Sequence, residues 1–115
     1  MEILLQSLYD CLGLEREADE SALFIDEELM VHFDETAQGL EIICPLGELP
    51  TDTDRLQRVL KMNYIGPVVL ASDADGAALL ALVRMPEDSS GEELLAALEG
   101  LIQAARGIKR ELCFV

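Results

Sequence analysis

Apolar side chains near the start of the chain recur at helical spacing. Leu4, Leu5, Leu8 and Leu12 fall on one side of a helix, and polar side chains hold the other side. Gly13 follows as a common type of helix stop. The pattern therefore predicts an amphipathic helix over residues 2–13, and the acidic, apolar-poor stretch 15–21 is expected to be a solvated loop.

The pattern then changes to a period of two, which is typical of strands. Residues 22–25 form a short apolar run, and apolar positions alternate over 29–34 and again over 40–44. Short turns at 26–27 and 35–39 separate these runs. Pro45 is expected to close the third strand, because proline cannot donate to a β-ladder. We therefore predict an antiparallel three-stranded meander.

A second helix is expected to begin within residues 50–54 and to run to about residue 64. Thr51 or Thr53 is the expected N-cap, and the nearby aspartates suit the positive end of the helix dipole. Three of the eight Lys and Arg residues, Arg55, Arg58 and Lys61, fall in this helix. In so acidic a chain they are expected to dock on acidic surface or to pair across a dimer.

Two more strands and a third helix complete the pattern. The Asp-Gly turn at 73–76 separates strands at 68–72 and 77–85. Ser89 or Ser90 begins the last helix, each with a glutamate three positions later as in a capping box. The buried side of that helix is predicted to hold Leu94, Leu98, Leu101, Ile102, Ala105 and Ile108. The result is one α+β domain over 1–115, in the order α-β-β-β-α-β-β-α.

Charge and composition restrict the partners. The chain carries a net charge of −15 over 115 residues and is 50% hydrophobic, so it should fold as a compact polyanion. Nucleic acid and anionic membranes would be repelled by this surface. Apolar surface beyond what a small core needs favours a second copy or another protein. The N-terminus lacks a basic region, and the apolar runs are too short for a membrane helix, so a cytoplasmic protein is expected.

Candidate chemistry is sparse. His32 is the one histidine, with Asp34 two residues away on the same strand face, and a catalytic role is the weaker interpretation. Cys11, Cys44 and Cys113 are widely spaced, which argues against a disulfide framework and for small core side chains. We expect no metal and no cofactor: the aspartates at 73–75 lack calcium-loop spacing, and the glycines form no phosphate loop.

Several segments together resemble the class I chaperones of type III secretion, the CesT/Tir-chaperone family. They include Leu12-Gly13-Leu14, 23–26, 40–50, 56–64 and 68–79, so the resemblance covers nearly the whole chain. Within the family the likeness is to chaperones of inositol-phosphate phosphatase effectors, the SigE and IpgE type. The segments that carry it are Leu8-Tyr9-Asp10, Gly13-Leu14, Cys44-Pro45, Leu49-Pro50 and Asn63-Tyr64.

The resemblance implies a non-enzymatic homodimer in the cytoplasm of a Gram-negative bacterium. It would bind the N-terminal segment of a secreted effector in extended form before the effector is exported. The ATPase that drives export is a second partner that the resemblance suggests. The family's dimer contact transfers to Leu56, Val59, Leu60, Asn63, Tyr64 and Val68. For effector binding we expect Leu5, Leu23, Ile25, Met30, His32 and Ile43, although some of these are core if one sheet face is buried.

Two other functions stay open from the residues alone. A regulatory or assembly module of the same fold would bind a folded partner instead of an extended segment. The third hypothesis is a small enzyme, and it has the least support because the sequence does not pair a nucleophile with a base.

Overall fold

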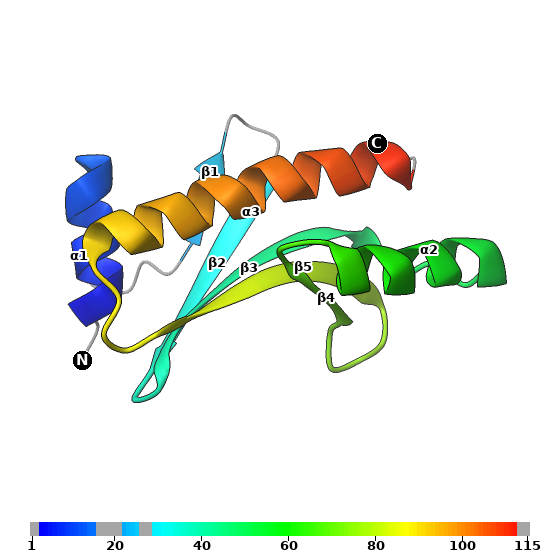
Figure 1. The fold of residues 1–115 in the computed structure, drawn as a ribbon, viewed down its shortest axis with the longest axis horizontal. Helices are drawn as coiled ribbons and strands as arrows, with labels where there is room; N and C mark the ends of the chain where they lie inside the picture. Colours follow the sequence, from blue (N-terminus) through cyan, green and yellow to red (C-terminus); the bar gives the residue numbers. More distant parts are fainter. Residues whose placement is uncertain (1–2, 16–21, 26–28, 113–115) are drawn as a thin grey trace.

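The computed structural model describes residues 3–15, 22–25 and 29–112. The expected α+β order is confirmed (Figure 1). The elements are α1 (Ile3–Leu12), β1 (Ala22–Ile25), β2 (Leu29–Thr36), β3 (Gly39–Glu48), α2 (Thr53–Ile65), β4 (Val69–Ser72), β5 (Ala78–Pro86) and α3 (Gly91–Glu111). The predicted turn at 26–27 and most of the acidic stretch at 15–21 lie outside the described residues.

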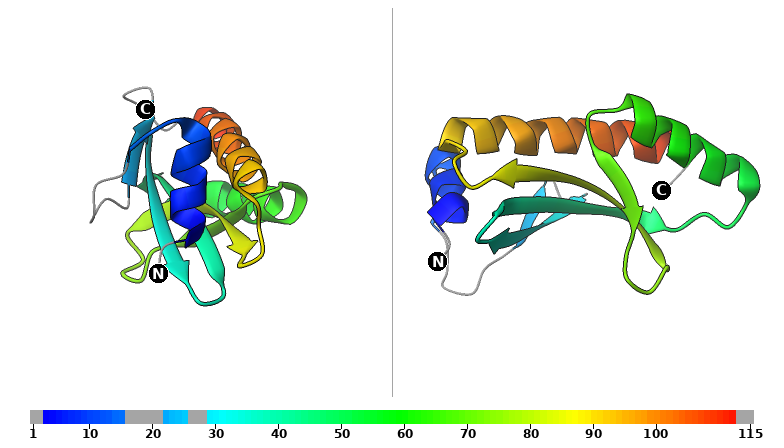
Figure 2. Two further views of the ribbon diagram at one scale, coloured as in Figure 1. Left: turned by 90° about the vertical axis from the view of Figure 1, so that its left-hand side faces the viewer. Right: turned by 60° about the horizontal axis from the view of Figure 1, so that its bottom comes forward.

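The strands form one antiparallel sheet in the order β1-β2-β3-β5-β4. The first three strands are the predicted meander. The long helix α3 runs along one face of the sheet and α1 crosses near its first turns, whereas α2 lies at the far end beside β4 (Figures 1 and 2). The sheet therefore has one helix-covered face, here called the inner face, and an opposite outer face.

Pro45 does not end the third strand, which corrects the prediction made from its missing N–H. β3 continues to Glu48, and Pro45 pairs in register with Leu80 of β5. The register shifts between Pro45 and Gly47, which marks a β-bulge. A bulge interrupts the ladder, and proline is tolerated at such a point because no ladder hydrogen bond is lost there.

The core lies between the inner face and the helices. Alternate residues of β2 are buried, as are Leu40, Ile42 and Cys44 of β3. The predicted side of α3 covers them, with Leu94, Leu98, Leu101, Ala105 and Ile108 buried and Ile102 half-buried. Tyr9 of α1 is fully buried and meets Phe33 edge-on, with ring centroids 6.1 Å apart. This aromatic contact helps to fix α1 against β2.

The helix ends follow the sequence signals closely but not completely. Gly13 adopts a φ of 71°, as a glycine stop requires, and Ser90 forms the predicted capping box with Glu93. The cap of α2 is Asp52 and not a threonine, because its carboxylate accepts the Arg55 N–H and also pairs with the Arg55 side chain. These hydrogen bonds hold the pKa of Asp52 below its usual value.

A single carboxylate from the sheet holds the first turn of α1. Glu35 of β2 accepts the Leu4 N–H at 2.9 Å and the Leu5 N–H at 3.0 Å through its two oxygens. The first N–H groups of a helix have no partner within the helix, and a negative charge suits that end. Glu35 therefore caps α1 across 30 residues of sequence and fixes where the helix starts on the sheet.

Glu35→Gln is expected to lower the free energy of unfolding by about 1–3 kcal/mol, because the amide can accept only one of the two hydrogen bonds and carries no charge. Urea unfolding followed by circular dichroism would measure the loss. Glu41→Gln is the matched control, because Glu41 pairs with an exposed Arg84 and its loss should cost less than about 1 kcal/mol. Equal losses in the two variants would contradict the capping role.

Candidate protein-binding surfaces

Apolar side chains form a band across the outer face of the sheet. The register aligns Ile43 of β3, Leu82 of β5 and Val69 of β4, and it pairs Phe24 of β1 with Met30 of β2. Directly paired residues share a face, so these side chains lie on the same side. His32 lies opposite Ile43 and joins the same face. We call these residues the outer-face stripe: Phe24, Met30, His32, Ile43, Leu82 and Val69.

The stripe is separate from the core and partly open to solvent. Phe24 is 58% exposed, and Met30 and Val69 are about 40% exposed. Leu82 is buried but does not belong to the core cluster, because the register puts its side chain on the outer face between Ile43 and Val69. Contiguous apolar surface of this kind on a charged protein is typical of a site for another polypeptide.

The two edges of the sheet differ in how well they are protected. At β4, the Asn63 side chain of α2 accepts the Leu70 N–H at 2.9 Å, so α2 covers that edge. β1 pairs with β2 on one side, and no other described strand pairs with its free side. An unpaired edge offers backbone donors and acceptors to an added strand. The β1 edge lies beside Phe24 at one end of the stripe.

A second apolar surface lies on α2. Val59 is the only buried residue of this helix, whereas Leu60 is 67%, Tyr64 91% and Ile65 80% exposed. Leu60 and Tyr64 are four residues apart and therefore share one side of the helix. A helix this weakly attached to its own domain is expected to gain its packing from another chain.

The structure divides the residues predicted to bind an effector into three groups. Met30, His32 and Ile43 lie together in the outer-face stripe. Leu23 and Ile25 are half-buried at the edge of the core on the inner side of β1. Leu5 is 1% exposed in the core, where a partner cannot reach it.

The residues predicted for the dimer contact are also divided. Leu60, Tyr64 and Asn63 are exposed on α2, and Leu56 is half-buried. Val59 and Val68 are 7% and 4% exposed and belong to the core of the single chain. The exposed members remain a candidate interface.

Sequence reasoning missed Phe24, Val69 and Leu82. All four residues of β1 are apolar, so alternation cannot say which of them face the helices. The strand register supplies that information, because it places Phe24 opposite the exposed Met30. A period-two pattern that includes Met30 and His32 could have indicated the outer face, but not its continuation into β5 and β4.

The structure also places the histidine and the cysteines considered above. The described residues contain no group of three His, Cys, Asp or Glu side chains placed to hold a metal ion. His32 is exposed between Ala22 and Ile43 in register. Cys44 is a core residue as expected and burial raises the pKa of its thiol, whereas Cys11 is exposed, contrary to expectation. Cys113 lies outside the described residues, and no described helix is long and apolar enough to span a membrane.

The sequence is similar to known chaperones along nearly its full length. It is 44% identical to the chaperone protein SigE of Salmonella typhi over 109 residues, which covers 95% of this chain and 96% of SigE. It is 25% identical to the chaperone protein IpgE of Shigella flexneri over 112 residues, covering 96% and 93% of the two chains.

The fold is also shared with a solved chaperone. The Yersinia pestis type III secretion chaperone SycH, solved in complex with a stable fragment of YscM2, superposes with a TM-score of 0.70 at 27% identity, covering 91% of this chain and 96% of SycH. The family model for the type III secretion chaperone domain matches residues 3–113. The sequence-based resemblance is thereby confirmed, and the chain belongs to the type III secretion chaperone family.

Proposed function

We propose that this type III secretion chaperone binds the N-terminal segment of a secreted effector in extended form and presents it for export. The observation that carries the proposal is the free β1 edge lying beside the outer-face stripe. An extended segment brings unpaired backbone groups together with alternating side chains. The edge pairs with the backbone, and the stripe receives the apolar side chains that point to its face.

The stripe suits a partner of irregular sequence. Met30 is flexible and polarisable and adapts to different side chains, while Phe24 provides a large apolar surface. Ile43 and the imidazole of His32 continue the surface inward from the edge. Leu23 and Ile25 pack against the core from the inner side of β1, so they act by holding this edge strand in place. Leu5 contributes only through the core.

The working unit is proposed to be a homodimer formed through α2. Leu60 and Tyr64 supply the exposed apolar surface of a self-complementary contact. Asn63 keeps its hydrogen bond to the β4 edge, which prevents the two sheets from joining there by strand addition. Val59 and Val68 support the helix from the core.

The finer assignments follow from the likeness to SigE and IpgE. We propose that the effector is of the inositol-phosphate phosphatase class, that binding occurs in the cytoplasm before export, and that the export ATPase receives the loaded chaperone. The chain acts by binding alone. Its anionic surface keeps a complex with exposed apolar segments in solution.

Phe24→Asp and Met30→Asp are each expected to weaken effector binding about 10- to 100-fold, because the buried apolar contact of each side chain contributes about 1.5–3 kcal/mol. The measurement is titration of the chaperone with N-terminal fragments of a type III inositol-phosphate phosphatase. Both side chains are exposed in the free protein, so folding should be unaffected. Limited proteolysis should show the bound fragment protected although it has no globular fold.

Ile65→Asp provides the control, because it places the same charge on an exposed apolar position of α2. It should bind the fragment like the unmodified protein. Equal weakening by all three variants would contradict a site on the outer face. Binding of a folded partner in place of the fragment would favour a regulatory module.

A further inference from the structure

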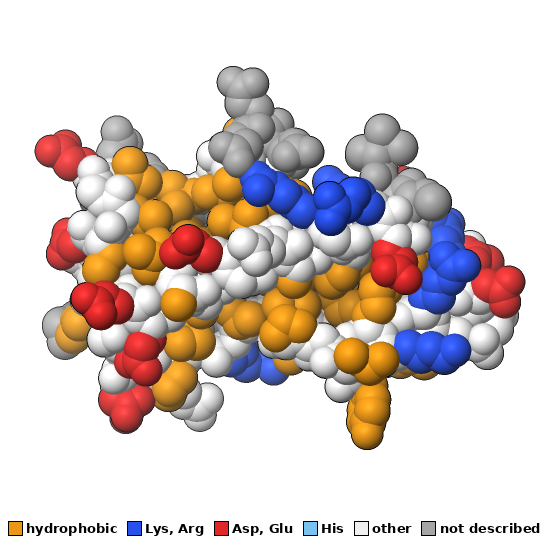
Figure 3. Space-filling model, turned by 45° about the horizontal axis from the view of Figure 1, so that its top comes forward, with side chains coloured by type: hydrophobic (Ala, Val, Ile, Leu, Met, Phe, Trp, Pro, Cys, Tyr) orange, Lys and Arg blue, Asp and Glu red, His pale blue; other side chains and the backbone are white. Residues whose placement is uncertain are grey.

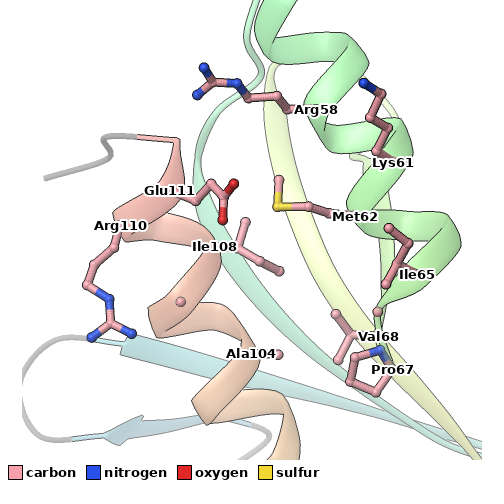
Figure 4. Close-up of a pocket in the computed structure, with 12 residues that line it drawn as sticks. Arg58, Lys61, Met62, Ile65, Pro67, Val68, Ala104, Ile108, Arg110 and Glu111 are labelled. Carbon is pink, nitrogen blue, oxygen red and sulfur yellow. The ribbon is translucent and has the colours of Figure 1, made fainter.

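A groove separates α2 from the C-terminal turns of α3. It has a volume of about 760 Å³. In Figure 4, Met62 and Ile65 of α2 face Ile108 of α3 across the groove, with Val68 and Pro67 at one end. The walls are therefore mostly apolar, and the volume is within the range of ordinary ligand-binding clefts.

The rim of the groove is cationic in a strongly anionic protein. Six of the eight Lys and Arg residues of the sequence lie on these two helices: Arg55, Arg58 and Lys61 on α2, and Arg106, Lys109 and Arg110 on α3. Figure 3 shows basic side chains gathered at this end of the molecule. Arg58, Lys61 and Arg110 line the groove together with one acidic residue, Glu111, and the three cations form no ion pair within the described part of the chain. In Figure 4 the Glu111 carboxylate lies on the groove side of α3, whereas the Arg110 guanidinium points away from α2.

The groove is distinct from the two surfaces proposed above. At 3.6 residues per turn, Met62 and Ile65 lie on average about 150° around α2 from Leu60 and Tyr64, so a contact through the latter side leaves the groove side open. β1 and β4 are opposite edges of the sheet, and α2 lies beside β4 (Figure 1). An effector segment held at the β1 edge is therefore at the opposite edge of the sheet from β4 and α2.

We propose that the groove docks an acidic amphipathic helix of a protein other than the effector. A third helix placed between two helices buries an apolar side against Met62, Ile65 and Ile108. Its carboxylates meet Arg58 and Lys61 on the α2 side of the rim. The rest of the chaperone surface repels acidic partners, so this cationic end also sets the direction of approach.

The test uses a designed peptide as the probe. The peptide has about 18 residues, enough for five helical turns, with leucine at helical spacing and glutamate at the other positions. A neutral control peptide has glutamine in place of every glutamate. Fluorescence anisotropy should show the acidic peptide binding at least about 10-fold more tightly than the control peptide, with an affinity that falls as salt is added. Equal binding of the two peptides, or no binding of the acidic peptide, would overturn the proposal.

Three variants locate the site. Lys61→Glu should weaken the acidic peptide about 10-fold or more, since it replaces attraction by repulsion at the rim. Arg84→Glu makes the same change in net charge on the sheet, where the side chain is 68% exposed, and should change binding less than about 2-fold. Ile65→Gln should weaken binding by loss of apolar contact. If Lys61→Glu and Arg84→Glu weaken binding equally, only net charge is at work and the groove is not the site.

Discussion

Leu60→Glu combined with Tyr64→Glu is expected to convert the chaperone from a dimer to a folded monomer. The two side chains are 67% and 91% exposed in the single chain, so their replacement should not disturb the core. In the proposed dimer they are buried, and four carboxylates would then meet across the two-fold axis. Uncompensated buried charge costs several kcal/mol, which exceeds what a small interface can supply. Sedimentation velocity would measure the loss of the dimer, and circular dichroism would show that the monomer remains folded.

Ile65→Glu is the matched control, because it puts the same charge on a neighbouring exposed position that faces the groove instead. It should remain a dimer. Val68 is unsuitable for this test: it is 4% exposed in the core, so a charged substitution would unfold the chain whatever its oligomeric state. A folded dimer in the double variant would place the interface on another surface.

The elements with one clear hydrophobic period were predictable from the sequence. The buried side of α3 repeats at helical spacing, and the Ser90 capping box marks where the helix begins. Where several local signals compete, the sequence is ambiguous. Thr51, Asp52 and Thr53 can all cap α2, and the choice of Asp52 depends on its additional contact with the Arg55 side chain. Pro45 does not end β3 as its missing N–H predicts, because the bulge that accommodates it depends on pairing with β5.

The binding surfaces were only partly predictable, since they depend on contacts between distant segments. Met30 and His32 are placed on the outer face by the alternation of β2 alone. The stripe exists because β3, β5 and β4 align Ile43, Leu82 and Val69, residues that are up to 39 positions apart. The cationic groove likewise requires α2 and the end of α3 to come together. Composition indicated surplus apolar surface but not how it divides into three sites.

Gly39→Ala is expected to be among the most destabilising single substitutions in the chain. Gly39 begins β3 with a φ of +146°, and an added Cβ would overlap the backbone carbonyl oxygen of Met85 on β5. Neither group belongs to a flexible side chain, so the β2–β3 hairpin must move away from β5. Backbone strain and the lost pairing together should lower the free energy of unfolding by about 3 kcal/mol or more, measured by urea denaturation.

Two other glycines separate the causes of that loss. Gly76 also has a positive φ, +69°, but open space around it, so Gly76→Ala should cost only about 1 kcal/mol from backbone strain. Gly100 lies in α3 with nothing near its added methyl group, so Gly100→Ala should stabilise the protein by about 0.5–1 kcal/mol through helix propensity. This ranking predicts that the steric overlap with β5 costs more stability than the positive φ angle alone. A Gly39→Ala variant at least as stable as Gly76→Ala would show that the hairpin moves away from β5 at no cost, which would contradict the prediction.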